Sequence, residues 1–200
     1  MRLYTDGSRV AHVRSAVLAL RAAPGSARAL ARVGARTEFG SPTTFTVAAA
    51  RGGWLEVIST ELPNGVHGFV RRSAVRLSRE PYSLEVDLSA RQARVWRWGL
   101  LARRLPVAIG SSASPTPVGR FALTDKLEGF HPEAYGCCVL ALSAHQTHLR
   151  AGWTGGDRIA IHGGTGIGSA VSNGCLHAAT ADLRWLMARL PLGTAVVIHP

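Results

Sequence analysis

Lysine is almost absent from this chain: Lys126 is the only lysine among 23 basic residues, and all the others are arginine. Acidic residues are also few, 12 in 200, so the formal net charge is +11. This charge predicts an anionic partner such as nucleic acid, anionic lipid or an anionic bacterial cell-wall polymer. The arginines are scattered and no nucleic-acid-binding motif is present, which argues against nucleic acid. A plain arginine-rich surface is the alternative.

Long apolar runs are missing as well. No run reaches the roughly 18 residues of a membrane span, so the sequence predicts no transmembrane segment. Near the N-terminus the longest apolar run, Ala16–Leu20, is shorter than the roughly 7–15 residues of a signal peptide's apolar region. The protein therefore either works in the cytoplasm or lacks its export segment in this chain. A hydrophobic content of 46% still provides for a buried core.

Cysteine is scarce, and three cysteines exclude a disulfide-rich scaffold. Cys137 and Cys138 are neighbours, and the short link between neighbours strains disulfide geometry. We therefore expect two unbridged strand residues, at least one of them buried. Cys175 stands apart in a glycine-rich stretch near the C-terminus.

Short β-strands separated by turns are predicted from Val33 to Leu77, which favours a small all-β barrel. The segment REPYSL around Pro81 is predicted to be a linker. Beyond it, apolar and polar residues alternate over 84–89, as in a half-buried strand, and further apolar strands follow. One helix is predicted in TADLRWLMARL, where Leu183, Leu186, Met187 and Leu190 share one face and Thr180 is the expected N-cap.

The stretch IAIHGGTGIGSAVSNGCLHA holds the side chains best suited to catalysis or metal binding. Gly174 before Cys175 allows a sharp turn and is expected to leave amide N–H groups free to bind an oxyanion. His162 ends an apolar strand, a rigid position for a base. An imidazole beside a thiol can form a thiolate–imidazolium pair that activates sulfur for acyl transfer. A buried, purely structural Cys175 is the alternative.

A zinc site made of His162, Cys175 and His177 is a further alternative. Two of these ligands are separated by a single residue, which is poor spacing for structural zinc. A fourth ligand would have to come from His145, His148 or Cys138. The sequence therefore disfavours a metal.

Two motifs resemble the L,D-transpeptidase catalytic domain of the YkuD type. IHGG…IGSAVSNGCLH is similar to the family's His-Gly, spacer, Ser-x-Gly-Cys signature, and SPTPVGRF looks like its upstream proline-rich loop. The resemblance covers about residues 82–199. It implies a mostly β catalytic domain, a β-sandwich with one late α-helix, that needs no metal or organic cofactor. It also implies a bacterial enzyme that acts on donor and acceptor stem peptides of peptidoglycan.

Carried over by motif, Cys175 would be the nucleophile that forms a thioester with the donor stem peptide. His162 would be the general base and acid, oriented by the backbone at Gly163, and amides near Gly174 would form the oxyanion hole. The residues that the resemblance assigns to substrate binding are Ser172, Asn173, His177 and Tyr135.

Two positions depart from the family pattern. His177 stands where the family usually has arginine, and histidine is mostly neutral at pH 7. The strength with which this position binds a substrate carboxylate, or the pH dependence of that binding, is therefore in question. Asn173 stands where the family often has histidine. Between the motifs, His145 and His148 could line the donor site or simply pack the loops, and Trp96, Trp98, Trp153 and Trp185 are expected in the core or on strand faces.

Residues 17–79 resemble a bacterial SH3-like module, a small β-barrel that often binds cell wall or packs on an enzyme. Trp54 and Phe69 occupy its usual aromatic positions, and we expect both in the barrel core. An L,D-transpeptidase following such a module is the leading hypothesis. A cysteine hydrolase of cell-wall peptides and a non-catalytic wall-binding protein are the alternatives. Because peptidoglycan lies outside the membrane, the enzyme is expected outside the cytoplasm, in the cell wall or its periplasm equivalent.

Overall fold

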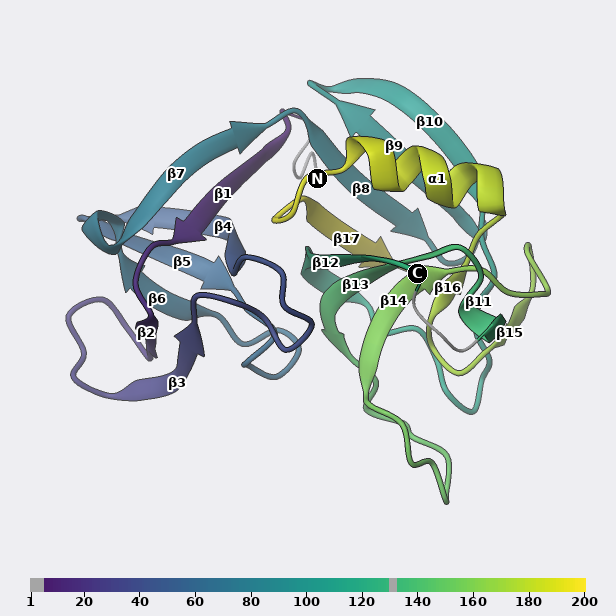
Figure 1. Cartoon of the computed structure of the whole chain (residues 1–200), viewed down its shortest axis with the longest axis horizontal. Helices are drawn as coiled ribbons and strands as arrows, with labels where there is room; N and C mark the ends of the chain where they lie inside the picture. Colours follow the sequence, from purple (N-terminus) through teal and green to yellow (C-terminus); the bar gives the residue numbers. More distant parts are fainter. Residues whose placement is uncertain (1–5, 130–132) are drawn as a thin grey trace.

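The computed structural model describes residues 6–129 and 133–200 (Figure 1). Part of the N-terminal segment compared with a signal peptide, residues 1–5, lies outside these ranges. The described chain is mostly β, with one α-helix near its C-terminus. None of its helices is long and apolar enough to cross a membrane.

The first seven strands form one sheet in the order β3-β2-β6-β5-β4-β1-β7. They are β1 (Ser8–Val13), β2 (Val17–Arg21), β3 (Ala29–Gly34), β4 (Thr44–Arg51), β5 (Trp54–Ile58), β6 (Gly68–Arg71) and β7 (Val75–Glu80), with the 3-10 turn η1 (Arg72–Ala74) before β7. Strand β1 precedes residue 17, where the predicted SH3-like unit begins, and pairs with both β4 and β7. No pairing joins the edge strands β3 and β7 in the described residues.

One face of this sheet covers its own apolar core. Phe45, Leu55 and Val70 are each about 1% exposed there. The prediction that Trp54 and Phe69 belong to this core is wrong, because both side chains are only half-buried. Successive strand residues point to opposite faces, so each aromatic residue lies on the face opposite to its buried neighbour.

The predicted linker around Pro81 is not observed. Pro81 alone separates β7 from β8 (Tyr82–Asp87), so the chain passes directly from one sheet into the next. The buried Ser8 hydroxyl donates a hydrogen bond to the Tyr82 carbonyl (2.6 Å) and accepts one from the Ala195 amide (2.8 Å). The two sheets are therefore tied together where a flexible connection was expected.

The second sheet has the order β10-β9-β8-β17-β12-β13-β14-β16, and β11 and β15 form a separate parallel pair. The remaining strands are β9 (Gln92–Arg97), β10 (Leu100–Pro106), β11 (Ile109–Gly110), β12 (Gly119–Glu128), β13 (Cys138–His145), β14 (Arg158–His162), β15 (Ala170–Ser172), β16 (Leu176–His177) and β17 (Ala195–His199). A short 3-10 turn, η2 (Glu133–Tyr135), precedes β13.

Strand β12 joins the two halves of this sheet. Its first part pairs with β17 and its second part with β13, with a register shift between Leu123 and Asp125. Such irregularities bend a strand and let it serve two sheet halves. Residues of both halves enter one apolar core, together with α1 (Thr180–Arg189).

The predicted helix is confirmed, with Leu183, Leu186, Met187 and Leu190 buried on one side. The prediction of Thr180 as its N-cap is wrong. Thr180 is the first helical residue, Ala179 occupies the cap position, and no side chain caps the helix.

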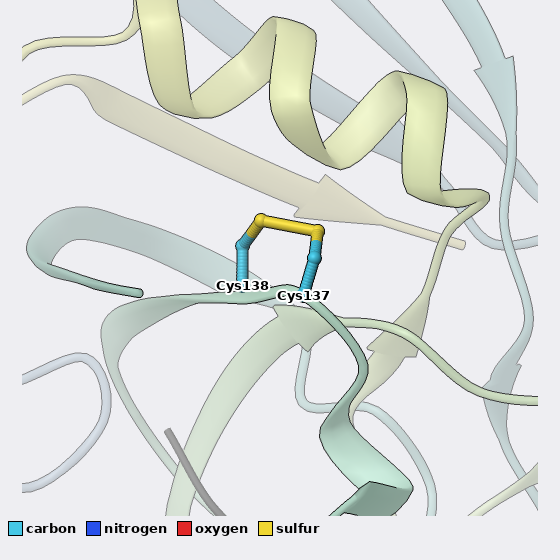
Figure 2. Close-up of a disulfide and its surroundings, with 2 residues drawn as sticks. All are labelled: Cys137 and Cys138. Atoms are coloured by element: carbon cyan, nitrogen blue, oxygen red, sulfur yellow. A yellow bond between two sulfur atoms is a disulfide. The ribbon is translucent and has the colours of Figure 1, made fainter. Parts of the chain in front are cut away.

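The expectation that Cys137 and Cys138 do not bridge is also wrong, because their sulfur atoms form a disulfide (Figure 2). Cys137 lies in the turn before β13, so strand alternation does not force the two side chains to opposite faces. Cys138 is buried, as expected for at least one of them, and both side chains pack against the core of the second sheet.

Candidate active site

The site is built on two short parallel strands, β14 and β16. Their register pairs Ile161 with Leu176 and His162 with His177. Ile161 and Leu176 are buried in the core below the sheet. Because side chains alternate, Cys175, His162 and His177 lie together on the opposite face. The sequence motif therefore brings its chemically active side chains to one surface.

That surface forms one wall of a cavity of about 420 Å³. Cys175, His162, His177, Asn173 and Tyr135 all line this cavity. His148 lines it as well, from the loop between β13 and β14. His145 does not line the cavity, because its ring bonds the Thr60 carbonyl (2.7 Å) and the Asp157 carboxylate (3.0 Å) instead.

The orientation of His162 is set by backbone groups. Its Nδ1 hydrogen-bonds the carbonyl oxygen of Gly163, and the Gly163 amide donates to the Tyr135 carbonyl (2.8 Å). A carbonyl only accepts, so Nδ1 carries the hydrogen and the neutral ring has its lone pair on Nε2. The imidazole contacts the rings of both Tyr135 (4.5 Å between centroids) and His177 (4.9 Å).

Burial governs the charge of both central groups. The pKa of His162 is lowered to about 4, mainly by burial and also by the nearby His177, against the opposing effect of the Gly163 carbonyl. Burial also raises the pKa of Cys175, partly offset by the amide of Ala160, which donates to its Sγ (3.4 Å). Both shifts favour a neutral thiol and a neutral imidazole at rest over the thiolate–imidazolium pair that such neighbours can form, because charge on either group is costly in this buried environment.

The amide of Gly174 is not free, contrary to prediction. It donates to the Ser172 hydroxyl (3.0 Å), which itself donates to the Cys175 carbonyl (2.6 Å). Ser172 is 4% exposed and is not among the residues that line the cavity, so its hydroxyl faces the loop backbone and not the space where a substrate would lie. By hydrogen-bonding the Gly174 amide and the Cys175 carbonyl, the Ser172 side chain fixes the conformation of the loop around the thiol.

Gln146 is a residue that the sequence analysis missed. Its buried side-chain amide donates to the carbonyls of Asn173 (2.8 Å) and Pro115 (3.2 Å) and accepts from the His148 amide (2.9 Å). It thereby ties three loops that are distant in sequence. No local sequence pattern could have revealed this role, because these loops come together only in the tertiary structure.

The sequence analysis did not place Trp153 or Arg158 at the cavity, and both line it. Trp153 was expected in the core or on a strand face but is 42% exposed at the cavity wall. Trp98, for which the expectation was the same, is 47% exposed away from the cavity. The Arg158 guanidinium bonds the Leu142 carbonyl, the Thr124 hydroxyl and Glu38 in the turn between β3 and β4, so it links the cavity wall to the N-terminal unit.

The zinc alternative finds no complete ligand set. Cys138 is held in the disulfide and His145 lies outside the cavity. Within residues 6–129 and 133–200, no group of three histidine, cysteine or acidic side chains is arranged to hold a metal ion. The geometry instead presents one thiol and one neutral imidazole at a common cavity, a set suited to nucleophilic chemistry.

The raised pKa of the thiol predicts the pH dependence of its alkylation. We expect the rate of iodoacetamide reaction at Cys175 to keep rising through pH 9. Burial raises the pKa of this thiol, so the reactive thiolate forms at a higher pH than it does for an exposed cysteine. Peptide mass mapping at each pH measures the rate, with Cys175→Ala as the blank. A rate plateau between pH 5 and about 7 would instead reveal a preformed ion pair and contradict this description.

Replacement of Gly174 should disturb the thiol loop. Its φ is +115°, and a Cβ there would collide with the Gln146 amide and approach Ile159 Cδ1 to 3.0 Å. We expect Gly174→Ala to lower the free energy of unfolding by at least about 1 kcal/mol more than Gly168→Ala does. Gly168 is the matched control, with φ of +84° but open space around it. Equal losses in denaturant titrations would contradict the proposed close packing.

Comparison with known proteins identifies the family. The family model of the YkuD L,D-transpeptidase catalytic domain matches residues 81–198. The L,D-transpeptidase YkuD of Bacillus licheniformis is 30% identical over 124 residues, which cover 60% of this chain and 67% of that protein.

Solved structures agree at the level of the fold. An L,D-transpeptidase from Mycobacterium smegmatis matches with a TM-score of 0.50 and 17% identity, over 82% of this chain and 76% of that one. L,D-transpeptidase 3 from Mycobacterium tuberculosis matches with a TM-score of 0.51 and 13% identity, over 78% and 73%. Since the family model spans more than half of the sequence, this chain belongs to the YkuD family of L,D-transpeptidase catalytic domains.

Proposed function

We propose that the cavity around Cys175 carries out the reaction of this family on peptidoglycan stem peptides. The supporting observation is that Cys175 and His162 lie on one face of the β14–β16 pair and line the same cavity. The family consists of cell-wall acyltransferases that work outside the cytoplasm, which agrees with a thiol placed for acyl transfer. The finer assignment of roles to individual residues is our proposal.

In the first step the Cys175 sulfur attacks the donor carbonyl that precedes a terminal D-residue. The thiol is neutral beforehand, so its proton passes to Nε2 of His162 as the carbon–sulfur bond forms. The resulting imidazolium then gives this proton to the leaving amine of the D-residue, and a thioester remains. General base and general acid steps by one histidine conserve the proton through this exchange.

In the second step an amine of the acceptor stem attacks the thioester carbonyl. His162, neutral again, takes the amine proton and returns it to the sulfur as the thioester breaks. The product is a peptide cross-link and a regenerated thiol. The low resting pKa keeps His162 unprotonated at neutral pH but also makes it a weak base, so it takes the proton only as the carbon–sulfur bond forms and the sulfur loses its hold on that proton.

The developing oxyanion needs backbone donors beside the thiol. Since the Gly174 amide is engaged by Ser172, we assign this role to the amide of Cys175 itself. The Gly163 carbonyl holds the tautomer of His162. Asn173, His177 and Tyr135 line the cavity and are proposed to contact the stem peptide.

His177 replaces the arginine usual at its position. Its Nδ1 lies 2.9 Å from the Thr165 carbonyl, which fixes the ring beside His162. An imidazole lacks the planar set of five donors with which a guanidinium holds a carboxylate through two parallel hydrogen bonds. We infer that His177 orients the stem peptide by hydrogen bonding rather than by a permanent charge.

The remaining parts of the chain are assigned around this enzyme. We propose an SH3-like unit over residues 17–79, to whose sheet and core β1 adds a strand, and the catalytic unit over 82–199, which has its own apolar core. The net charge of +11 supports binding to an anionic cell-wall polymer. Work outside the cytoplasm would require an export route for this chain.

Faropenem tests the proposed nucleophile, since the Mycobacterium tuberculosis relative was solved in complex with a faropenem-derived adduct. We expect a covalent mass increase on the wild-type chain and none on Cys175→Ala. His162→Gln should slow adduct formation about 100-fold or more, because a general base is lost. His148→Gln is the control, a cavity histidine without a catalytic role, and should change the rate less than about threefold. An adduct on Cys175→Ala would overturn the assignment.

A further inference from the structure

The outer face of the N-terminal sheet carries aromatic and basic side chains rather than a purely polar surface. Strand alternation places Leu55 and Val70 toward the core, and Trp54, Phe69 and Arg71 on the other face. Trp54 and Phe69 are half-buried and Arg71 is exposed. The aromatic residues expected to fill the barrel are therefore part of an accessible surface.

On this face, Arg51, Trp54 and Arg71 form a row across three adjacent strands. The register pairs Arg51 on β4 with Trp54 on β5, and Trp54 with Arg71 on β6. The two-residue turn Gly52–Gly53 has positive φ at both positions, as tight hairpins require, and sets Arg51 directly opposite Trp54. The Arg71 guanidinium stacks on the Trp54 ring, 4.7 Å from its centroid.

The positive charge of this row is not neutralised by neighbouring acids. Among the described residues, no carboxylate lies within ion-pair distance of Arg51 or Arg71. The acidic residue of this face, Glu56, is held by His67 at 2.6 Å. Arg21, directly opposite Phe69 in the sheet, adds a further cation, and its guanidinium donates to the backbone carbonyls of residues 26 and 27.

We propose that the Arg51–Trp54–Arg71 row binds a phosphodiester-linked cell-wall polymer. Guanidinium groups bind phosphate oxygens through paired hydrogen bonds, and the Trp54 ring holds the Arg71 guanidinium in place for this contact. The row spans two strand spacings, about 10 Å, so successive phosphates of one polymer can meet both arginines. An open sheet face gains affinity from such repeated contacts, which a single small anion does not supply.

This inference rests on the proposed action at the cell wall and adds a way of holding the enzyme near its substrate. The row lies on the N-terminal sheet, whereas Cys175 lies on the second sheet, so the two functions are separable by mutation. Faropenem labelling reports on the active site, and polymer binding reports on the row. Failure of one can therefore be distinguished from failure of the other.

The test uses sedimentation of the full chain with peptidoglycan sacculi that carry glycerol-phosphate polymer. A second batch of the same sacculi is treated with hydrofluoric acid, which cleaves phosphodiesters and leaves peptidoglycan. The R51Q/R71Q variant is compared with R97Q/R104Q, which loses the same charge at exposed positions of β9 and β10. All variants are checked for unchanged faropenem labelling.

We expect R51Q/R71Q to bind untreated sacculi about tenfold more weakly than wild type, and R97Q/R104Q to bind within about twofold. Wild-type binding should fall by a similar factor on treated sacculi and should weaken with added salt, as for polyanion binding. Equal binding to treated and untreated sacculi would overturn the proposal in favour of peptidoglycan itself. Equal losses in both variants would overturn it in favour of general charge attraction.

Discussion

The mechanism that we propose depends on the hydrogen bond between His162 and the carbonyl of the next residue, Gly163. That carbonyl fixes which ring nitrogen carries the proton, and the Gly163 amide is itself held by the Tyr135 carbonyl. No carboxylate is needed for this orientation. The pairing of β14 with β16 then places this neutral, buried imidazole and the neutral thiol on the same sheet face.

The loops around these strands are held from a distance. Gln146 ties the thiol loop to the proline-rich loop, and Ser172 closes the turn before Cys175. The loop between β5 and β6 contributes as well, because Asn64 bonds both backbone groups of His145, one residue before Gln146. The N-terminal unit therefore supports the cavity around Cys175 in addition to carrying its own basic row.

Local patterns predicted the helix, the strand alternation and the motif residues, because each depends on neighbours a few positions apart. The sequence did not reveal the outward position of Trp54, the engaged amide of Gly174 or the resting charge of Cys175. The first depends on the phase of one strand in its sheet. The other two depend on a hydroxyl and on burial, which the packing of distant segments creates. The adjacent disulfide depends on the turn that precedes β13.

The central claim is that the thioester at Cys175 is resolved by an amine rather than by water. The direct measurement is mass spectrometry of products from a donor stem tetrapeptide, with and without an acceptor stem that carries a free side-chain amine. The account predicts a cross-linked peptide that has lost the donor's terminal D-residue, and its absence with Cys175→Ala. A shortened, uncross-linked donor as the sole product in the presence of acceptor would contradict it and indicate a hydrolase.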